Sequence, residues 1–269
     1  MNGTRGFPER IVCLTEETTE TLYLLGEDWR IVGISGFTVR PPQARKEKPK
    51  VSAFTSAKID RIVELAPDLV LGFSDLQADI AAQLVRAGIE VHVFNHRSVA
   101  EILRTVRVLG GMIGCEAKTA ALISSLEAGL DEVRAQASAL VRRPRVYFEE
   151  WDEPQISAIR WVSELIGIAG GADCFPELAR EPLGKNRIIA DPLEVVRRAP
   201  DIILGSWCGK KFRPESVAAR PGWADVPAVR SGFLREIKSP LILQPGPAAL
   251  TDGVRAIHDV VQQWAREIA

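Results

Sequence analysis

The sequence predicts an α/β protein made of two lobes, each with a mostly parallel sheet, joined by one long α-helix. One segment occurs twice: residues 62–72 read IVELAPDLVLG and residues 195–205 read VVRRAPDIILG, an offset of 133 residues. Strand-like and helix-like runs alternate in both halves, which is typical of a parallel sheet covered by helices on both faces. Two such lobes predict a cleft, and clefts are where small ligands bind.

Each copy of the repeat has the same order: a short helix, an Ala-Pro-Asp turn, an apolar strand and a glycine. A residue that precedes proline is disfavoured in the helical region, so the helices should end at Ala66 and Ala199. The strands that follow are continuous apolar runs, as expected for parallel strands buried on both faces.

The first lobe, residues 1–114, contains strand and helix signals in alternation. Gly26 and Gly88 end two of its helices, because glycine is the residue that most often follows a helix. Two tandem prolines and a basic cluster predict that residues 37–57 form a loop. The expected strands are 11–14, 31–34, 69–72 and 90–94, and the expected helices are 18–25, 58–65, 75–87 and 98–109.

A connecting helix is expected within residues 115–142. Residues 116–141 lack proline, and their apolar side chains recur at intervals of three and four. At about 1.5 Å per residue, some 26 residues would reach about 40 Å, the width of a lobe. The alternative is a helix packed within one domain. The side chains of the apolar face are Leu122, Leu126, Leu130, Val133 and Leu140, with Ala137 filling the gap between the last two.

The second lobe, residues 143–269, repeats the alternation. Asp191 followed by Pro192 is a favourable helix start. The expected strands are 145–148, 202–205 and 233–237, and helices are expected at 161–168, after Pro192 and at 251–268.

Composition excludes several classes of protein. The net charge of −1 gives no nucleic-acid footprint, and no apolar run is long enough to span a membrane. Four cysteines without a CxxC spacing and three histidines disfavour a metal site built from side chains. We therefore expect no protein-held metal and no nucleic-acid partner. We also expect a monomer without a covalent cofactor. Residues 1–9 lack the pattern of a secretory signal, which favours the cytoplasm unless a signal has been removed.

Several segments resemble one known family. They are residues 11–15 (IVCLT), 18–20 (TTE), 31–35 (IVGIS), 41–44 (PPQA) and 59–70 (IDRIVELAPDLV). These residues resemble the cobalamin-binding branch of the class III (helical-backbone) periplasmic-binding-protein superfamily. The resemblance implies two Rossmann-like lobes joined by one helix. It also implies a corrinoid or similar metal chelate held in the inter-lobe cleft, as in the substrate-binding component of an ABC importer.

Candidate ligand-binding residues follow the predicted strands, because ligands of α/β sheets sit beyond the carboxyl ends of strands. The resemblance places aromatic side chains at the positions of Phe37, Phe54 and Phe73. The alternative for these aromatic residues is core or edge packing. The full set is Phe37, Arg40, Phe54 and Phe73 in the first lobe and Trp151, Trp207, Lys210 and Gln244 in the second.

The segment 207–211 (WCGKK) is the most unusual local motif. Lys210 and Lys211 beside a glycine could hold an anionic group, although lysine pairs are more often solvated. Cys208 and His96 are weighed as ligands of a chelated metal against ordinary packing roles. The alternative hypothesis is therefore a cytosolic relative that binds a siderophore, haem or another anionic cofactor and takes no part in transport.

The resemblance also implies an ABC transporter permease as partner, and a periplasmic location. In the family one acidic residue on each lobe contacts the permease. Asp60 takes this position in the first lobe. The position in the second lobe is Leu193, with the carboxylate one residue later at Glu194.

An enzyme is the least favoured interpretation. GxSxG, GxxxxGK and HExxH motifs are absent from the sequence. The acid pairs Glu16-Glu17 and Glu149-Glu150 lie near predicted strand ends, and neighbours on a strand point to opposite faces. We expect no catalytic residues.

Overall fold

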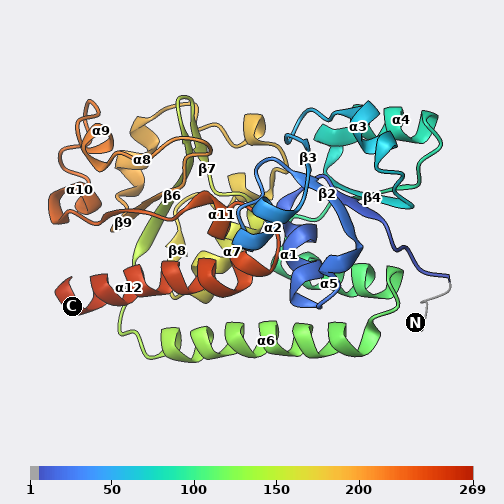
Figure 1. Ribbon diagram of the computed structural model, residues 1–269. Helices are drawn as coiled ribbons and strands as arrows, with labels where there is room; N and C mark the ends of the chain where they lie inside the picture. The colour runs from blue at the N-terminus through green and yellow to red at the C-terminus, as the bar shows by residue number, and fades with distance from the viewer. Residues whose placement is uncertain (1–5, 269) are drawn as a thin grey trace. The chain divides into compact units, whose positions relative to one another are not determined.

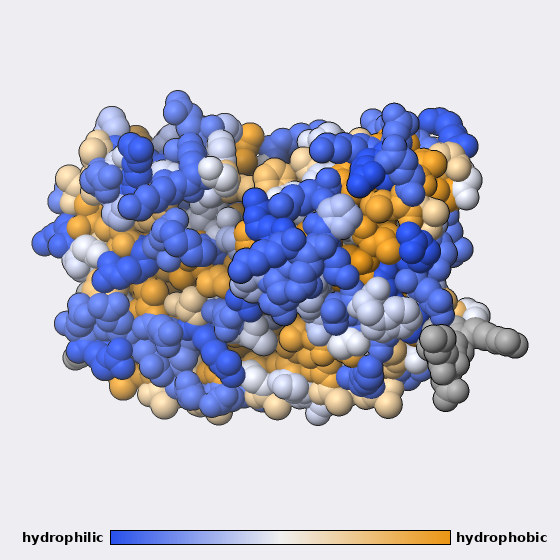
Figure 2. All heavy atoms as spheres, in the orientation of Figure 1, coloured by the Kyte–Doolittle hydropathy of each residue, from blue (hydrophilic) through white to orange (hydrophobic). Residues whose placement is uncertain are grey.

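The computed structural model describes residues 6–268, and the chain divides into two compact units (Figure 1). Unit 1 comprises Met1–His96, Ala100–Leu126 and Pro245–Pro247. Unit 2 comprises Arg97–Val99, Glu127–Gln244 and Ala248–Ala269. No helix among the described residues is long and apolar enough to cross a membrane. The face drawn in Figure 2 interleaves hydrophilic and apolar atoms.

Unit 1 is built on a five-stranded parallel sheet in the order β3-β2-β1-β4-β5. Its central strand, β1, pairs with β2 on one side and with β4 on the other. The direction of the connections reverses at β1, and α/β sheets bind ligands at such a point. The strands are β1 (Ile11–Cys13), β2 (Ile31–Ser35), β3 (Lys50–Ser52), β4 (Leu69–Phe73) and β5 (Val91–Phe94).

Two apolar clusters cover the two faces of this sheet. Ile11 and Cys13 of β1 pack in the cluster that includes Leu22 of α1 and Leu109 of α5. Val12 packs on the opposite face, with side chains of α3 and α4. Successive side chains of a strand alternate between faces, so apolar strands need helices on both sides. The helices are α1 (Glu16–Leu24), α3 (Ile59–Glu64), α4 (Ala78–Arg86) and α5 (Val99–Met112).

The prediction that residues 37–57 form a loop is wrong in part. They contain a short helix, α2 (Pro42–Glu47), and the edge strand β3. Pro42 occupies the start of α2, where its missing N–H costs nothing. Buried Ala44 packs α2 against one apolar cluster of the sheet, and buried Val51 packs β3 against the other. Both elements are too short for a periodic apolar pattern, so their burial against the sheet determines them.

The repeated Ala-Pro-Asp turns adopt the same backbone conformation. Ala66 and Ala199 have φ angles of 43° and 44°, which takes both out of the right-handed helical region, as predicted. The amide N of Asp68 donates to Arg10 O at 2.9 Å, and that of Asp201 donates to Arg145 O at 2.8 Å.

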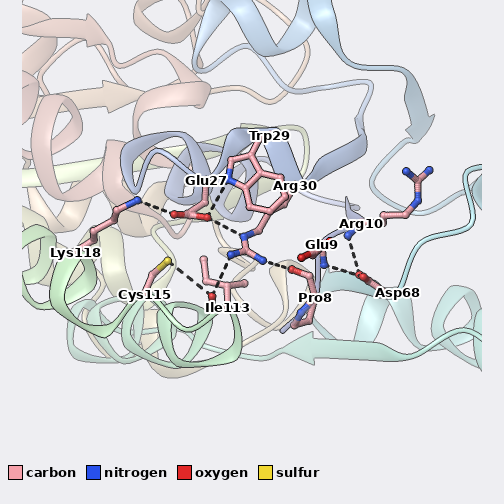
Figure 3. A network of polar contacts seen from close by, with 10 residues as sticks. All are labelled: Pro8, Glu9, Arg10, Glu27, Trp29, Arg30, Asp68, Ile113, Cys115 and Lys118. Carbon is pink, nitrogen blue, oxygen red and sulfur yellow. Dashed lines mark hydrogen bonds and ion pairs between the residues drawn. The ribbon is translucent and has the colours of Figure 1, made fainter. Parts of the chain in front are cut away.

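The carboxylates of these turns complete a latch on the start of each central strand. Asp68 accepts from the backbone N–H of Arg10 at 2.9 Å, and Asp201 accepts from that of Arg145 at 2.8 Å (Figure 3 for Asp68). The turn in unit 1 therefore fixes the amino end of β4 against that of β1. The turn in unit 2 fixes the amino end of β9 (Ile202–Gly205) against that of β6 (Arg145–Asp152). We call these two sets of contacts the Asp68 latch and the Asp201 latch.

A second polar network in unit 1 surrounds buried Arg30 (Figure 3). Glu27 accepts from Arg30 Nε at 2.8 Å and from Lys118 Nζ at 2.7 Å. Burial alone would raise the pKa of Glu27, but the hydrogen bonds from Lys118 and Arg30 outweigh it and lower that pKa to about 2. This network joins the start of β2 to the start of the long helix α6 (Glu116–Ser138) within unit 1.

Unit 2 contains a mixed sheet in the order β10-β9-β6-β7, with β8 paired to the start of β6. The predicted strand 145–148 continues to Asp152, and the antiparallel strand β7 pairs with this extension. Three of the four residues of the extension, Glu149, Glu150 and Asp152, are acidic, so no apolar run predicts it. The strands are β6 (Arg145–Asp152), β7 (Gln155–Ser157), β8 (Ala172–Asp173), β9 (Ile202–Gly205) and β10 (Leu234–Glu236).

Helices of unit 2 pack through single apolar faces. In α12, which follows a π-helical turn (Ala249–Gly253), Val254, Ile257, Val261 and Trp264 are buried at helical spacing. The helices are α7 (Arg160–Ile168), α8 (Leu193–Arg198), α9 (Pro214–Ala218), α10 (Pro227–Ser231), α11 (Ser239–Ile242) and α12 (Val254–Ile268).

The long helix α6 (Glu116–Ser138) runs without interruption for 23 residues (Figure 1). The division between the two units falls inside it, after Leu126. It ends before residue 141, where it was expected to end, and Val141 is 99% exposed. The predicted fold class, two α/β lobes with one long helix joining them, is confirmed.

Candidate functional site

The carboxyl ends of the strands of unit 1 place the three predicted phenylalanines in different surroundings. Phe37, after β2, is 57% exposed. Phe54 packs against the edge of the apolar core, and its carbonyl accepts from Gln77 Nε2 at 2.9 Å. Phe73 is buried, with its ring edge-on to His96 at 5.0 Å between centroids. Phe37 is therefore the aromatic side chain of the three with a large free surface.

Arg40 and His96 are both engaged by neighbours in unit 1. Arg40 Nε donates to Glu20 Oε1 at 2.9 Å. His96 is buried, and its Nε2 lies 2.7 Å from Pro245 O. Because a carbonyl only accepts, Nε2 carries the proton and donates it. That nitrogen is therefore committed to the backbone.

Two neighbouring acidic residues follow β1, and the strand geometry assumed for them from the sequence is wrong. Glu16 and Glu17 lie in the first turn of α1, not on a strand, so their side chains do not alternate between faces. Glu17 is buried and accepts from Thr15 Oγ1 at 2.5 Å. Burial is the main cause that raises the pKa of Glu17 to about 8, and it also raises the pKa of Glu16. Gly246 packs so closely that a Cβ there would lie 2.5 Å from Glu17 Cβ.

In unit 2, a buried carboxylate fixes Trp207 after β9. Trp207 Nε1 donates to Glu149 Oε1 at 3.0 Å. Glu149 also accepts from Tyr147 Oη at 2.9 Å and from both terminal nitrogens of Arg220 at 2.6 and 2.9 Å. Glu149 is fully buried, and four hydrogen bonds satisfy its two oxygens. We call these four residues the Glu149 hub.

Lys210 lies over two indole rings. Its Nζ is 4.4 Å from the centroid of the Trp151 ring and 5.3 Å from that of Trp207. Asp152 Oδ1 pairs with the same Nζ at 2.5 Å. These distances are in the range of cation–π interactions. Trp151, Trp207 and Lys210 are separate candidates in the sequence, and the fold brings all three together within unit 2.

The second acid pair behaves as the strand geometry predicts. Glu149 binds Arg220, whereas Glu150 binds Arg187 at 2.7 and 3.0 Å. Both carboxylates are therefore engaged in ion pairs with different arginines.

Gln244, also a predicted ligand residue, is half-buried at the end of the unit 2 segment that precedes Pro245.

A pocket of about 380 Å³ opens beside Trp207. Its walls come from the segments that follow β9 and β10. The lining residues are Trp207, Gly209, Lys210, Lys211, Glu236, Ile237, Lys238 and Ser239. Cys208, in the same loop, is exposed, whereas burial raises the pKa of the Cys13 and Cys174 thiols to about 12.

The two carboxylates predicted to contact a permease each lie in the first turn of a short helix, one residue out of register with the repeat. Asp60 is exposed at the second residue of α3, and Glu194 is the second residue of α8. Glu194 accepts from Arg197 at 2.7 Å and from Arg198 at 2.9 Å, so its charge is compensated. Leu193, the position given by the repeat offset, is 46% exposed.

Comparison with known proteins assigns the class. The model of the periplasmic binding protein family matches residues 11–241, so the chain belongs to this family, whose members are binding proteins and not enzymes. The chain is 24% identical over 94% of its length to the uncharacterized ABC transporter substrate-binding lipoprotein YvrC of Bacillus subtilis, covering 80% of that protein. It is 26% identical over 89% of its length to a cobalamin-binding protein of Halobacterium salinarum, 66% of which it covers.

Solved structures share the fold. The vitamin B12 binding protein BtuF of Vibrio cholerae superposes with a TM-score of 0.76 at 20% identity, over 97% of this chain and 98% of that one. The haem-binding protein RhuT of Roseiflexus superposes with a TM-score of 0.78 at 25% identity, over 94% and 99%. The resemblance seen in the sequence is thus confirmed. The family is periplasmic, so the preference for the cytoplasm drawn from residues 1–9 is not supported.

Proposed function

We propose that the chain is the substrate-binding component of an ABC importer, and that its ligand is a corrinoid or a closely similar metal chelate. The observation that carries the ligand proposal is the cluster of Trp151, Trp207 and Lys210 at the carboxyl ends of β6 and β9. Cobalamin-binding and vitamin B12-binding proteins among the relatives support it.

The cluster suits a large ligand with an apolar ring and polar edges. Trp207 is only 5% exposed, because it packs in the apolar core of unit 2 and bonds to Glu149. Half-buried Trp151 therefore offers the larger aromatic surface of the two, and Trp207, fixed beneath the same lysine, needs no reorganisation when a ligand arrives. An aromatic side chain covered by a ligand contributes about 1.5–3 kcal/mol. In unit 1, Phe37 offers a second aromatic surface, after β2. Arg40, Phe54, Phe73 and Gln244 remain candidate contacts.

The available side chains favour a chelate whose metal needs no ligand from the protein. Haem carriers usually supply His, Cys, Met or Tyr to the iron. His96 and His258 are buried and bonded to carbonyls, and Tyr147 is buried in the Glu149 hub. The half-buried histidine is His92, whose ring lies edge-on to Phe94, and the half-buried tyrosine is Tyr23, whose hydroxyl bonds to Glu47. Among the described residues, no group of three or more His, Cys, Asp and Glu side chains is arranged for a metal ion.

Exposed Cys208 is the specific observation that favours haem as a second candidate ligand. It follows β9 directly after Trp207, where a thiolate could reach a bound iron. A haem complex of this kind should lose its thiolate-type absorption bands in Cys208→Ser, whereas corrinoid binding should be unaffected by that change.

The permease is the partner implied by this function. Asp60, exposed on α3, is the stronger candidate contact because Glu194 is already paired with two arginines. The protein would then act outside the cytoplasm, as the family does.

Equilibrium titration tests the ligand. Cyanocobalamin, dicyanocobinamide and hemin are added separately while tryptophan fluorescence and ligand absorption are recorded. We expect micromolar or tighter binding of a corrinoid, and about a tenfold loss in Trp151→Ala, equivalent to about 1.4 kcal/mol. Trp29→Ala is the matched control, since Trp29 is 53% exposed and lies in unit 1. Absence of corrinoid binding at high micromolar concentration would overturn the ligand proposal.

A further inference from the structure

Three lysines line the pocket beside Trp207, which is more positive charge than contact with an uncharged ring would require. We propose that this pocket, the lysine pocket, binds a monoanionic phosphodiester carried by the ligand. The inference rests on the proposed function, because it assigns one part of the ligand to a place in unit 2. Its occupant is defined by chemistry: a tetrahedral anion with a single charge, linked to a ring that the neighbouring indoles contact.

Charge in the pocket is unbalanced by one. Lys210 pairs with Asp152, and Lys238 pairs with Glu236. Lys211 lines the pocket, is exposed, and forms no ion pair among the described residues. Three ammonium groups are therefore balanced by two carboxylates, Glu236 in the pocket lining and Asp152 outside that lining. A phosphodiester carries one negative charge and would neutralise the remainder.

Pairing of the strands brings these lysines together from two distant segments. Strands β9 and β10 run parallel, with Gly205 opposite Glu236. The chain therefore leaves both strands at the same edge of the sheet, and residues 207–211 meet residues 236–239 there. Lysines drawn from two strand exits are a feature of the fold and not of a local charged run.

The loop after β9 orients the lysine pair. Gly209 has a φ of +77°, a region that glycine enters without strain. The amide N of Lys210 donates to Trp207 O at 3.4 Å, closing a turn that places Lys210 over the indoles. With Lys210 held there by Asp152, Lys211 is the cation left for a ligand anion. Ser239 adds a hydroxyl group, which can donate a hydrogen bond to a phosphate oxygen.

A pair of corrinoids separates this subsite from the ring-binding surface. Cyanocobalamin carries a phosphodiester in its nucleotide loop, and dicyanocobinamide has the same ring without that loop. We expect Lys211→Gln to weaken cyanocobalamin binding about three- to tenfold. Dicyanocobinamide binding should stay within about twofold of the wild type, because the ring contacts are unchanged.

The control variant is Lys185→Gln, an exposed lysine of unit 2 outside the pocket. It should leave both affinities unchanged. The effect of Lys211→Gln should shrink as salt is raised from 0.05 to 0.5 M, since screening weakens an exposed charge pair (roughly a 10 Å Debye length at 0.1 M). Equal loss for both corrinoids, or no loss for either, overturns the inference while the proposed ligand stands.

If neither corrinoid binds the wild type, the proposed ligand fails, and the pocket is tested by itself. Diethyl phosphate and inorganic phosphate are then titrated while ³¹P line widths are measured. Broadening of the diethyl phosphate signal that Lys211→Gln abolishes and Lys185→Gln preserves supports a phosphodiester site. Broadening of inorganic phosphate alone, or no broadening, overturns it.

Discussion

The amino edges of the two sheets are built alike, whereas their carboxyl edges are not. At the amino edges, the Asp68 and Asp201 latches use the same turn, the same alanine conformation and equivalent bonds to the central strands. At the carboxyl edges, unit 1 carries buried acids and an exposed phenylalanine, and unit 2 carries two tryptophans and a lysine pocket. The residues at the amino edges therefore build the fold, whereas the residues at the carboxyl edges give each unit its own chemistry.

The strongest test of this contrast is the Glu149 hub, because removing one partner leaves another buried charge alone. Glu149→Ala should lower the free energy of unfolding by about 3–5 kcal/mol, since Arg220 loses its counter-charge. Urea denaturation measures the loss. In the control Glu64→Ala, an exposed pair with Arg61 is lost, and the change should stay below about 1 kcal/mol. Similar losses in the two variants would show that the hub is not special.

The buried acid of unit 1 should respond to pH in the opposite sense to an ordinary carboxylate. Glu17 has a pKa of about 8, above the ordinary value of 4.5, mainly because of burial. The folded state therefore holds a proton that the unfolded state has lost, and stability falls as pH rises from about 4.5 to about 8, by at most about 1.4 kcal/mol per pH unit.

Glu17→Gln should flatten that decline when unfolding is measured between pH 5 and pH 8. Glu27 offers the matched comparison in the same unit, because its pKa is lowered to about 2. Its contribution should be complete above pH 4.5 and lost as pH falls towards 2. An unchanged pH profile in Glu17→Gln would mean that Glu17 is ionised in the folded protein.

The two latches should contribute different amounts to the free energy of unfolding, because their carboxylates are buried to different degrees. Asp201 is 6% exposed and also accepts from Arg142 at 2.9 Å, whereas Asp68 is exposed. We expect Asp201→Asn to cost about 1–3 kcal/mol and Asp68→Asn less, as judged by thermal and urea unfolding. A larger cost at Asp68 would contradict the view that burial sets the value of the latch.

The smallest effect is expected at the two left-handed alanines. Ala66→Gly and Ala199→Gly relieve the contact of Cβ with the backbone but add freedom to the unfolded chain. The two terms oppose each other, so each variant should change the free energy of unfolding by less than about 1 kcal/mol. The two values should agree, because the φ angles of 43° and 44° are the same. A clear difference between them would break the equivalence of the amino edges.

Short sequence patterns predicted the helix ends, because a helix end depends on one or two residues. Gly26 and Gly88, both with positive φ, follow the helices that they were expected to end. The helix α2 and the strand β3 escaped prediction because each is short and is held by burial of Ala44 or Val51. The end of β6 escaped because its polar residues bind partners distant in sequence, such as Arg187 for Glu150.

The sequence by itself determined the α/β class, the repeated turn and the buried strands, since proline geometry, glycine conformation and apolar runs act within a few residues. Only the tertiary structure decided the chemistry of the site. Glu149 bonds to Trp207 across 58 residues of sequence and to Arg220 across 71, and parallel pairing of β9 with β10 places Lys211 and Lys238 in the lining of one pocket. Contacts of that range leave no periodic trace in the chain, because they depend on which strands become neighbours.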